Sequence, residues 1–210
     1  MSSRIAIIWN PTKTDRETLE AGLAAAAGKR DLDVQWFETT EDDPGQKVAA
    51  QALAAGADVI VIAGGDGTIR AVAEHLADEA ADAELAIVPL GTGNLFARNL
   101  DVPINDVPGA LTRALDGDAR PVDVGWVEVD LAGGSERHGF VVMVGFGVDA
   151  HMIAETDDDL KDKAGWLAYV ESLGRALSAT EVLPFHITKD DEPSRDEEGH
   201  TLLIGNCGMI

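Results

Sequence analysis

The sequence predicts an α/β protein with two domains, an α/β domain in residues 1–120 and a β-rich domain in residues 121–210 that is incomplete. In the first part, short apolar runs alternate with helical stretches of about 10–14 residues, which is the pattern of βαβ units. After Arg120 the apolar runs follow one another more closely, as strands joined by loops do. The chain of 210 residues, 45% hydrophobic and 26% charged, is long enough for this arrangement.

Residues 1–120 are predicted to form a Rossmann-like parallel sheet with helices on both faces. The expected strands are the apolar runs Ile5–Trp9, Leu32–Phe37, Asp58–Ala63 and Glu84–Pro89. The run DVIVIA at 58–63 is β-branched and apolar throughout, which is typical of a central strand. The expected helices are the stretches Thr14–Ala27, Pro44–Ala55, Thr68–Ala81, Asn94–Leu100 and Val107–Leu115. In such sheets, ligands bind beyond the carboxyl ends of the strands.

Residues 121–210 contain four further apolar runs that we expect to be strands. They are Pro121–Leu131, Gly139–Val148, Pro184–Lys189 and Thr201–Asn206. One helix is expected between them, over Gly165–Ala179. The polar stretch DDEPSRDEEG at 190–199 is interpreted as a solvated hairpin tip.

Composition excludes several classes of protein. There are 16 basic and 38 acidic side chains, so the net charge is −22, and such a field repels nucleic-acid backbones. The single cysteine, Cys207, excludes a disulfide framework and is interpreted as a strand residue. No apolar run reaches the roughly 18–20 residues of a membrane span, and the N-terminus lacks a signal-peptide pattern. We therefore expect a cytoplasmic protein without a transmembrane segment.

The strongest motif is GGDGT at residues 64–68, between a predicted strand and a predicted helix. Its three glycines let the backbone turn sharply and approach a ligand closely. The free N–H groups at the start of the following helix favour a phosphate there. Asp66 suits this loop if its partner is a metal ion or a polarised hydroxyl. The alternative is a plain turn in which Asp66 caps the helix.

Two further polar turns follow predicted strands at the same edge of the sheet. The first is GTGN at 91–94, in which Thr92 would donate to a phosphate and Asn94 would bridge the two glycine loops. One turn later, Arg98 would either hold phosphate charge or pair with an acid. The second is Asn10-Pro11-Thr12-Lys13 after the first strand, which is a weak motif by itself.

Together these motifs resemble the diacylglycerol-kinase catalytic-domain superfamily, which includes bacterial soluble lipid kinases, sphingosine kinases and ceramide kinases. The resemblance rests on GGDGT, on GTGNLFARNL at 91–100 and on the Asn-Pro turn. It extends through RPVDVG at 120–125, GFGVDA at 145–150 and KAGWLAY at 163–169.

The resemblance implies transfer of the γ-phosphate of ATP, with Mg²⁺, to a lipid hydroxyl at a membrane surface. The acceptor would be diacylglycerol-like or a long-chain base, and a homodimer is left open. Asp66 would be catalytic, organising magnesium or the reacting hydroxyl. For Thr40 there is an alternative, because Thr39 lies beside it and both would equally cap the next helix. The residues expected to contact ATP are Asn10, Thr40, Gly64, Gly65, Asp66, Gly67, Thr68, Ile69, Arg70, Thr92 and Asn94.

The sequence departs from the family pattern at three points. Arg70 stands where many relatives have Asn, and Leu95 stands where many bacterial relatives have Asp. The third is the Asp-Gly-x-Leu-like segment that supplies a general base and metal ligands in relatives, to which no residue here corresponds. Two alternatives follow: a nucleotide-binding module without catalysis, or an NAD kinase, which shares GGDGT but not GTGNLFAR.

Overall fold

The computed structural model describes residues 4–147, 182–190 and 192–208. The segment KAGWLAY at 163–169, the predicted helix over 165–179 and the last three residues of GFGVDA lie outside the described residues. Contacts divide the chain into two compact units, Met1–Val142 with Asn206–Ile210, and Met143–Gly205. The two predicted functional domains, 1–120 and 121–210, stay a prediction.

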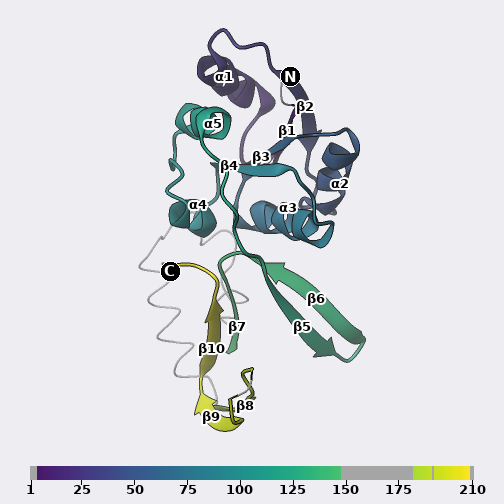
Figure 1. Ribbon diagram of the computed structural model, residues 1–210, viewed down its shortest axis with the longest axis vertical. Helices are drawn as coiled ribbons and strands as arrows, with labels where there is room; N and C mark the ends of the chain where they lie inside the picture. Colours follow the sequence, from purple (N-terminus) through teal and green to yellow (C-terminus); the bar gives the residue numbers. More distant parts are fainter. Residues whose placement is uncertain (1–3, 148–181, 191, 209–210) are drawn as a thin grey trace. The chain divides into compact units, whose positions relative to one another are not determined.

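The first unit is built on a four-stranded parallel sheet, as predicted (Figure 1). Its strands are β1 (Arg4–Trp9), β2 (Asp33–Glu38), β3 (Val59–Gly64) and β4 (Glu84–Pro89). Their order is β2-β1-β3-β4, so β1 and β3 are the central strands. The register places Ile8 beside Ile62 and Ile62 beside Ile87. All four strands run in one direction, so their carboxyl ends lie at one edge of the sheet.

Helices cover both faces of this sheet (Figure 1). One face carries α1 (Arg16–Ala27) and α5 (Val107–Asp116), which pack against each other, and the other carries α2 (Gln46–Ala54) and α3 (Asp66–Asp78). The short helix α4 (Leu95–Asn99) follows β4. The predicted α/β class with helices on both faces is therefore confirmed. Helix α3 begins two residues before the predicted start at Thr68, so it includes Asp66 and Gly67.

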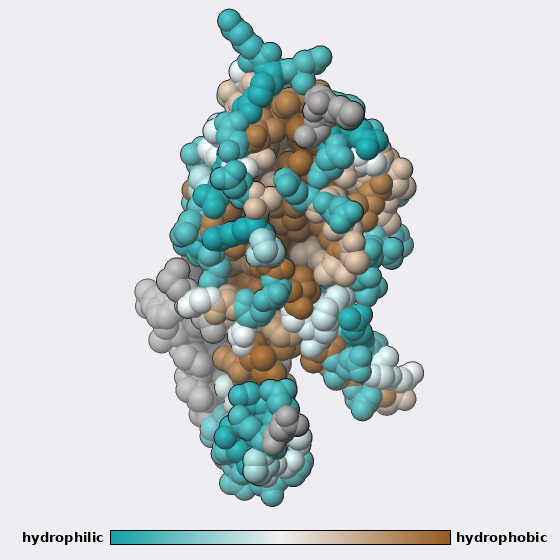
Figure 2. All heavy atoms as spheres, in the orientation of Figure 1, coloured by the Kyte–Doolittle hydropathy of each residue, from teal (hydrophilic) through white to brown (hydrophobic). Residues whose placement is uncertain are grey.

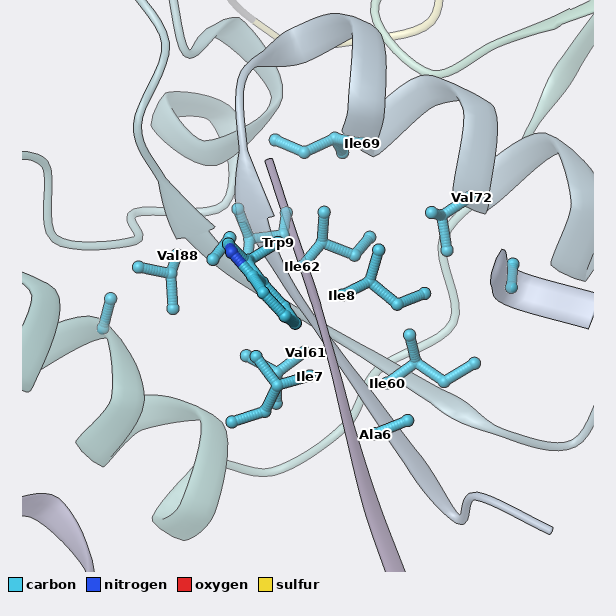
Figure 3. Close-up of a cluster of buried hydrophobic side chains, with 14 of the residues drawn as sticks. Ala6, Ile7, Ile8, Trp9, Ile60, Val61, Ile62, Ile69, Val72 and Val88 are labelled. Atoms are coloured by element: carbon cyan, nitrogen blue, oxygen red, sulfur yellow. The ribbon is translucent and has the colours of Figure 1, made fainter. Parts of the chain in front are cut away.

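The core of the first unit is the apolar interior of the sheet (Figure 3). Successive side chains along each strand alternate between the two faces of the sheet, so Ile8 and Ile62 lie on the side of α3, and Ile7 lies on the other. Ile69 of α3 is fully buried against this surface. Burying a side chain of this size is worth about 1.5–3 kcal/mol, which fixes the first turn of α3 on the sheet.

Strands β5 (Gly125–Leu131) and β6 (Gly134–Phe140) form an antiparallel hairpin in the first unit. The hairpin lies against α3, where Arg137 Nη1 donates to Asp78 Oδ1 at 2.8 Å. Two predictions were wrong here. The strand expected from Pro121 begins four residues later, and the one expected over Gly139–Val148 is divided between β6 and β7. The polar sequence GSERH hid most of β6, because this strand is exposed and carries no apolar alternation.

The second unit is β-rich in its described residues, as predicted. Strand β7 (Met143–Gly147) pairs antiparallel with β10 (Thr201–Gly205), and β8 (Leu183–Ile187) pairs antiparallel with β9 (Arg195–Gly199). The interpretation of 190–199 as a hairpin tip was wrong for its second half. Residues 195–199 form β9, whose charged side chains face solvent while its backbone completes the hairpin.

Asp15 caps α1 and makes its stability dependent on pH. The Thr18 backbone N–H donates to Asp15 Oδ1 at 2.7 Å, and this hydrogen bond lowers the pKa of the Asp15 carboxyl. A lowered pKa in the folded state stabilises the protein above the unfolded value of about 4, and this contribution is lost as the pH falls through the folded pKa. We expect Asp15→Ala to lower the melting temperature clearly at pH 6. In thermal denaturation, the difference from the wild type should shrink as the pH falls below the usual range of an Asp carboxyl. A difference that is independent of pH would contradict the assignment.

Candidate functional site

The Asn-Pro turn lies at the carboxyl end of β1, next to the end of β3. The Asn10 N–H donates to the Ala63 carbonyl at 2.9 Å, which ties the turn to the central strand. Asn10 Oδ1 accepts hydrogen bonds from the Thr12 N–H at 2.9 Å and from Thr12 Oγ1 at 2.7 Å. Asn10 is therefore held in a closed Asx turn beside the first glycine loop.

The first glycine loop leads directly into an uncapped helix. Gly64 ends β3, Gly65 is the N-cap residue of α3, and no side chain caps this helix. The Ile69 N–H donates to the Gly65 carbonyl at 3.1 Å, so the earlier N–H groups have no acceptor within their own helix. Gly67 is exposed, and a Cβ atom there would meet no atom within 4 Å. This helix start is open to an anionic ligand.

The second glycine loop is closed by Asn94. Its side chain bonds Gly91 twice, accepting from the Gly91 N–H at 2.8 Å and donating to the Gly91 carbonyl at 2.6 Å. Asn94 has φ +50°, a left-handed conformation that Asn tolerates better than most residues, and it is 2% exposed. Thr92, between these two residues, is exposed.

The two glycine loops are in backbone contact. The Leu90 N–H donates to the Gly64 carbonyl at 2.8 Å, which continues the pairing of β3 with β4 into the loops. A Cβ atom on Gly91 would lie 2.8 Å from Gly65 Cα, and one on Gly65 would lie 3.3 Å from Gly91 Cα. A side chain at Gly91 would therefore overlap the opposite backbone, and one at Gly65 would press against it.

Asp66 joins the first loop to the second. Its Oδ2 accepts from the Asn94 N–H at 2.7 Å, and its Oδ1 accepts from the Leu95 N–H at 2.8 Å. The alternative weighed from the sequence, in which Asp66 caps its own helix, is not what the structure shows. Its carboxylate caps the turn into α4 instead. Asn94 takes part in the bridge between the loops through its backbone N–H, whereas its side chain bonds Gly91 within its own loop.

Thr68, Ile69 and Arg70 were expected to contact ATP, and the structure places their side chains in two different environments. Thr68 and Ile69 are 5% and 0% exposed, so their side chains lie in the interior. Arg70 Nη1 lies 2.5 Å from Glu74 Oε2 and 3.4 Å from the Gly139 carbonyl in β6. The guanidinium of Arg70 thus joins α3 to the hairpin in this structure.

Thr40 is exposed, and it lies just after β2 in a small turn. Its N–H donates to the Asp43 carbonyl at 3.1 Å. Neither Thr39 nor Thr40 caps α2. Asp43, which sequence reasoning missed, accepts N–H groups from the start of that helix, including those of Lys47 at 3.0 Å and Val48 at 3.1 Å. An Asp two residues before Gly45 and the helix was the signal that could have identified this cap.

The described residues around the glycine loops form no cluster of metal-ligating side chains. Among the residues that the structure describes, no group of three or more His, Cys, Asp or Glu side chains is placed to hold a metal ion. A pocket of about 710 Å³ runs along the edge strand β4, and none of the predicted site residues lines it. Figure 2 shows apolar surface between polar side chains on the first unit, in the orientation of Figure 1.

Comparison with known proteins identifies the family. The model of the diacylglycerol kinase catalytic domain matches residues 4–127, more than half of the chain. The chain belongs to this family. The match covers the sheet and both glycine loops, and it ends in the first strand of the hairpin. The resemblance inferred from the motifs is therefore confirmed.

Bacterial relatives of this chain are named as lipid kinases. A protein of Pseudomonas aeruginosa named "Probable lipid kinase YegS-like" is 38% identical over 169 residues, which are 80% of this chain and 52% of the relative. A protein of the same name in Pseudomonas syringae is 43% identical over 150 residues, 70% of this chain and 45% of the relative. The chain thus spans about half the length of these relatives.

A solved structure shares the fold. The crystal structure of a diacylglycerol kinase from Bacillus anthracis matches this chain with a TM-score of 0.68 and 26% identity. The match spans 99% of this chain and 67% of the solved chain. Among the described residues, no helix is long and apolar enough to cross a membrane. The chain is therefore a member of a kinase family whose named relatives are lipid kinases.

The contact between the loops predicts opposite effects at two glycines of the site. Gly91→Ala should lower the free energy of unfolding by about 1–3 kcal/mol, because its methyl group overlaps the backbone at Gly65. Gly67→Ala should leave this free energy unchanged or raise it by up to about 1 kcal/mol, because the position is open and helical. Urea denaturation measures both. Equal losses at the two positions would contradict the packing.

Proposed function

We propose that this protein is an ATP- and Mg²⁺-dependent lipid kinase that transfers the γ-phosphate of ATP to a lipid hydroxyl. The acceptor is diacylglycerol-like or a long-chain base, presented at a membrane surface on the cytoplasmic side. The observation that carries the proposal is the pair of glycine loops in contact at the carboxyl ends of β3 and β4, beside the uncapped start of α3. Membership of the diacylglycerol kinase catalytic-domain family supports the reaction class.

The open helix start suits the phosphates of ATP. The amides of Gly67 and Thr68 precede Ile69, whose N–H makes the first hydrogen bond within the helix, and the helix dipole adds partial positive charge. In the proposed complex these groups and the exposed Thr92 hydroxyl bind phosphate oxygens. Phosphoryl transfer needs positioning and charge neutralisation more than covalent chemistry, so a rigid cradle of backbone donors is suited to it.

Magnesium is proposed as the partner of the ATP phosphates. Mg²⁺ in kinases is bound through one or two carboxylates together with substrate phosphates and water. Asp66 is the carboxylate that lies between the two loops, and each of its oxygens keeps capacity for a further contact beside the backbone N–H that it accepts. The ion would neutralise charge on the transferred phosphoryl group.

The lipid acceptor is proposed from the family and from the names of the relatives. A lipid-borne hydroxyl cannot leave its membrane or micelle, so the kinase would meet it at that surface. The net charge of −22 does not favour attraction to anionic headgroups. Contact with the surface would therefore depend on recognition of the acceptor more than on charge.

A label-transfer assay tests the proposed reaction. The purified chain would be incubated with Mg²⁺, γ-labelled ATP and mixed micelles that contain diacylglycerol or sphingosine, followed by separation into organic and aqueous phases. We expect label in the organic phase with one of these lipids. Bound ATP without transfer would favour a nucleotide-binding module that lacks catalysis. Label on NAD would favour an NAD kinase.

Gly67 offers a test of the phosphate cradle that does not depend on turnover. We expect Gly67→Val to weaken ATP binding at least about tenfold, because its side chain would occupy the open face where the phosphates bind. The melting temperature should change little. Gly133→Val is the matched control, since Gly133 at the tip of the hairpin also has open space around it. Isothermal titration with ATP measures both variants, and equal affinities would contradict the proposed binding mode.

A further inference from the structure

We infer that Asp66 is a positioning residue, which holds the second glycine loop and its Thr92 against the start of α3. We call the two hydrogen bonds from the N–H groups of Asn94 and Leu95 to Asp66 the clamp, and the clamp is inferred from geometry alone. Its consequence for nucleotide binding rests on the proposed function. Both carboxylate oxygens of Asp66 are engaged, one by the N–H of Asn94 and the other by the N–H of Leu95.

The geometry of the clamp is tight. The two hydrogen bonds measure 2.7 and 2.8 Å and join residues 28 and 29 positions apart in the chain. A Cβ atom on Gly93 would lie 3.1 Å from Asp66 Oδ2, so the loop backbone lies directly against the carboxylate. Hydrogen bonds between a carboxylate and backbone N–H groups are about twice as strong as neutral ones. The position of the second loop therefore depends on the charge of Asp66.

Thr92 is the predicted ligand contact that depends on this clamp. It is exposed and lies between Gly91, which contacts Gly65, and Gly93, which contacts Asp66. Within the loop, the two hydrogen bonds of Asn94 to Gly91 make a closed turn. We therefore expect the closed turn to shift as a unit. Loss of the Asp66 carboxylate would then displace Thr92 without any change in Thr92 itself.

Asp66→Asn tests the clamp directly. An Asn side chain has one acceptor oxygen, and its amino group would face a backbone N–H, so at least one of the two hydrogen bonds is lost. We expect amide hydrogen exchange at Asn94 and Leu95 to become at least about tenfold faster, as a hydrogen bond to a charged group of roughly 1.5–3 kcal/mol implies. Exchange in β1 and β3 should stay slow.

Asp15→Asn is the matched control. Asp15 also accepts a backbone N–H at a helix start, that of Thr18 in α1, far from the loops in the sequence. It should leave the exchange of Asn94 and Leu95 unchanged. If Asp66→Asn does not fold, Gly93→Ala replaces it, because its methyl group would crowd Asp66 Oδ2 without removing the carboxylate. Faster exchange at the same two amides is expected there as well.

Nucleotide binding without metal separates positioning from a role as metal ligand. A positioning residue predicts that Asp66→Asn weakens binding of ATP in the presence of EDTA, by at least about threefold, because Thr92 is displaced. A residue that acts only through Mg²⁺ predicts unchanged or tighter ATP binding in EDTA and a higher Mg²⁺ requirement. The second result, or unchanged amide exchange in Asp66→Asn, would overturn the inference. If the wild type binds no ATP, the proposed function fails, and the exchange experiment still decides whether Asp66 is a clamp.

Discussion

The site depends on one steric constraint, the backbone contact between Gly65 and Gly91. Neighbouring strands of a sheet are about 4.8 Å apart, so loops that leave β3 and β4 at the same edge must pass each other closely. A Cβ atom on Gly91 would come within 2.8 Å of the opposite backbone. With glycine on both sides, the loops touch, Asn94 closes the second loop, and Asp66 reaches across from the first.

Different parts of α3 serve packing on the sheet and the proposed binding of a ligand. Ile69 and Val72 are buried on the sheet, and they fix the helix by the hydrophobic effect (Figure 3). The first turn before Ile69 keeps its N–H groups open, because the N-cap residue Gly65 has no side chain and the Asp66 carboxylate bonds the second loop. A rigid helix with an uncapped start results, and this arrangement is suited to a phosphate.

The negative charge of the chain opposes binding of ATP at the proposed site. A net charge of −22 repels a nucleotide, although this repulsion is screened beyond about 10 Å in ordinary salt. Binding must therefore come from donors at contact distance. The backbone amides at the start of α3 would supply such donors without basic side chains, and an Mg²⁺ complex carries less negative charge than free ATP. The guanidinium of Arg70 is engaged by Glu74 and by the hairpin.

The sequence by itself determined the parallel sheet, the order of its strands and helices in the chain, and the position of the glycine loops, because these features follow from local periodicity and from turn chemistry. Strand β6 was missed, since an exposed hairpin strand needs no apolar pattern. The direction of the Asp66 carboxylate was decided only by the tertiary structure. A carboxylate near a helix start ordinarily caps its own helix, whereas the Asp66 carboxylate accepts N–H groups from a turn that begins 28 residues later. The role of Arg70 in joining α3 to the hairpin was likewise decided by contacts between distant segments, which no local pattern encodes.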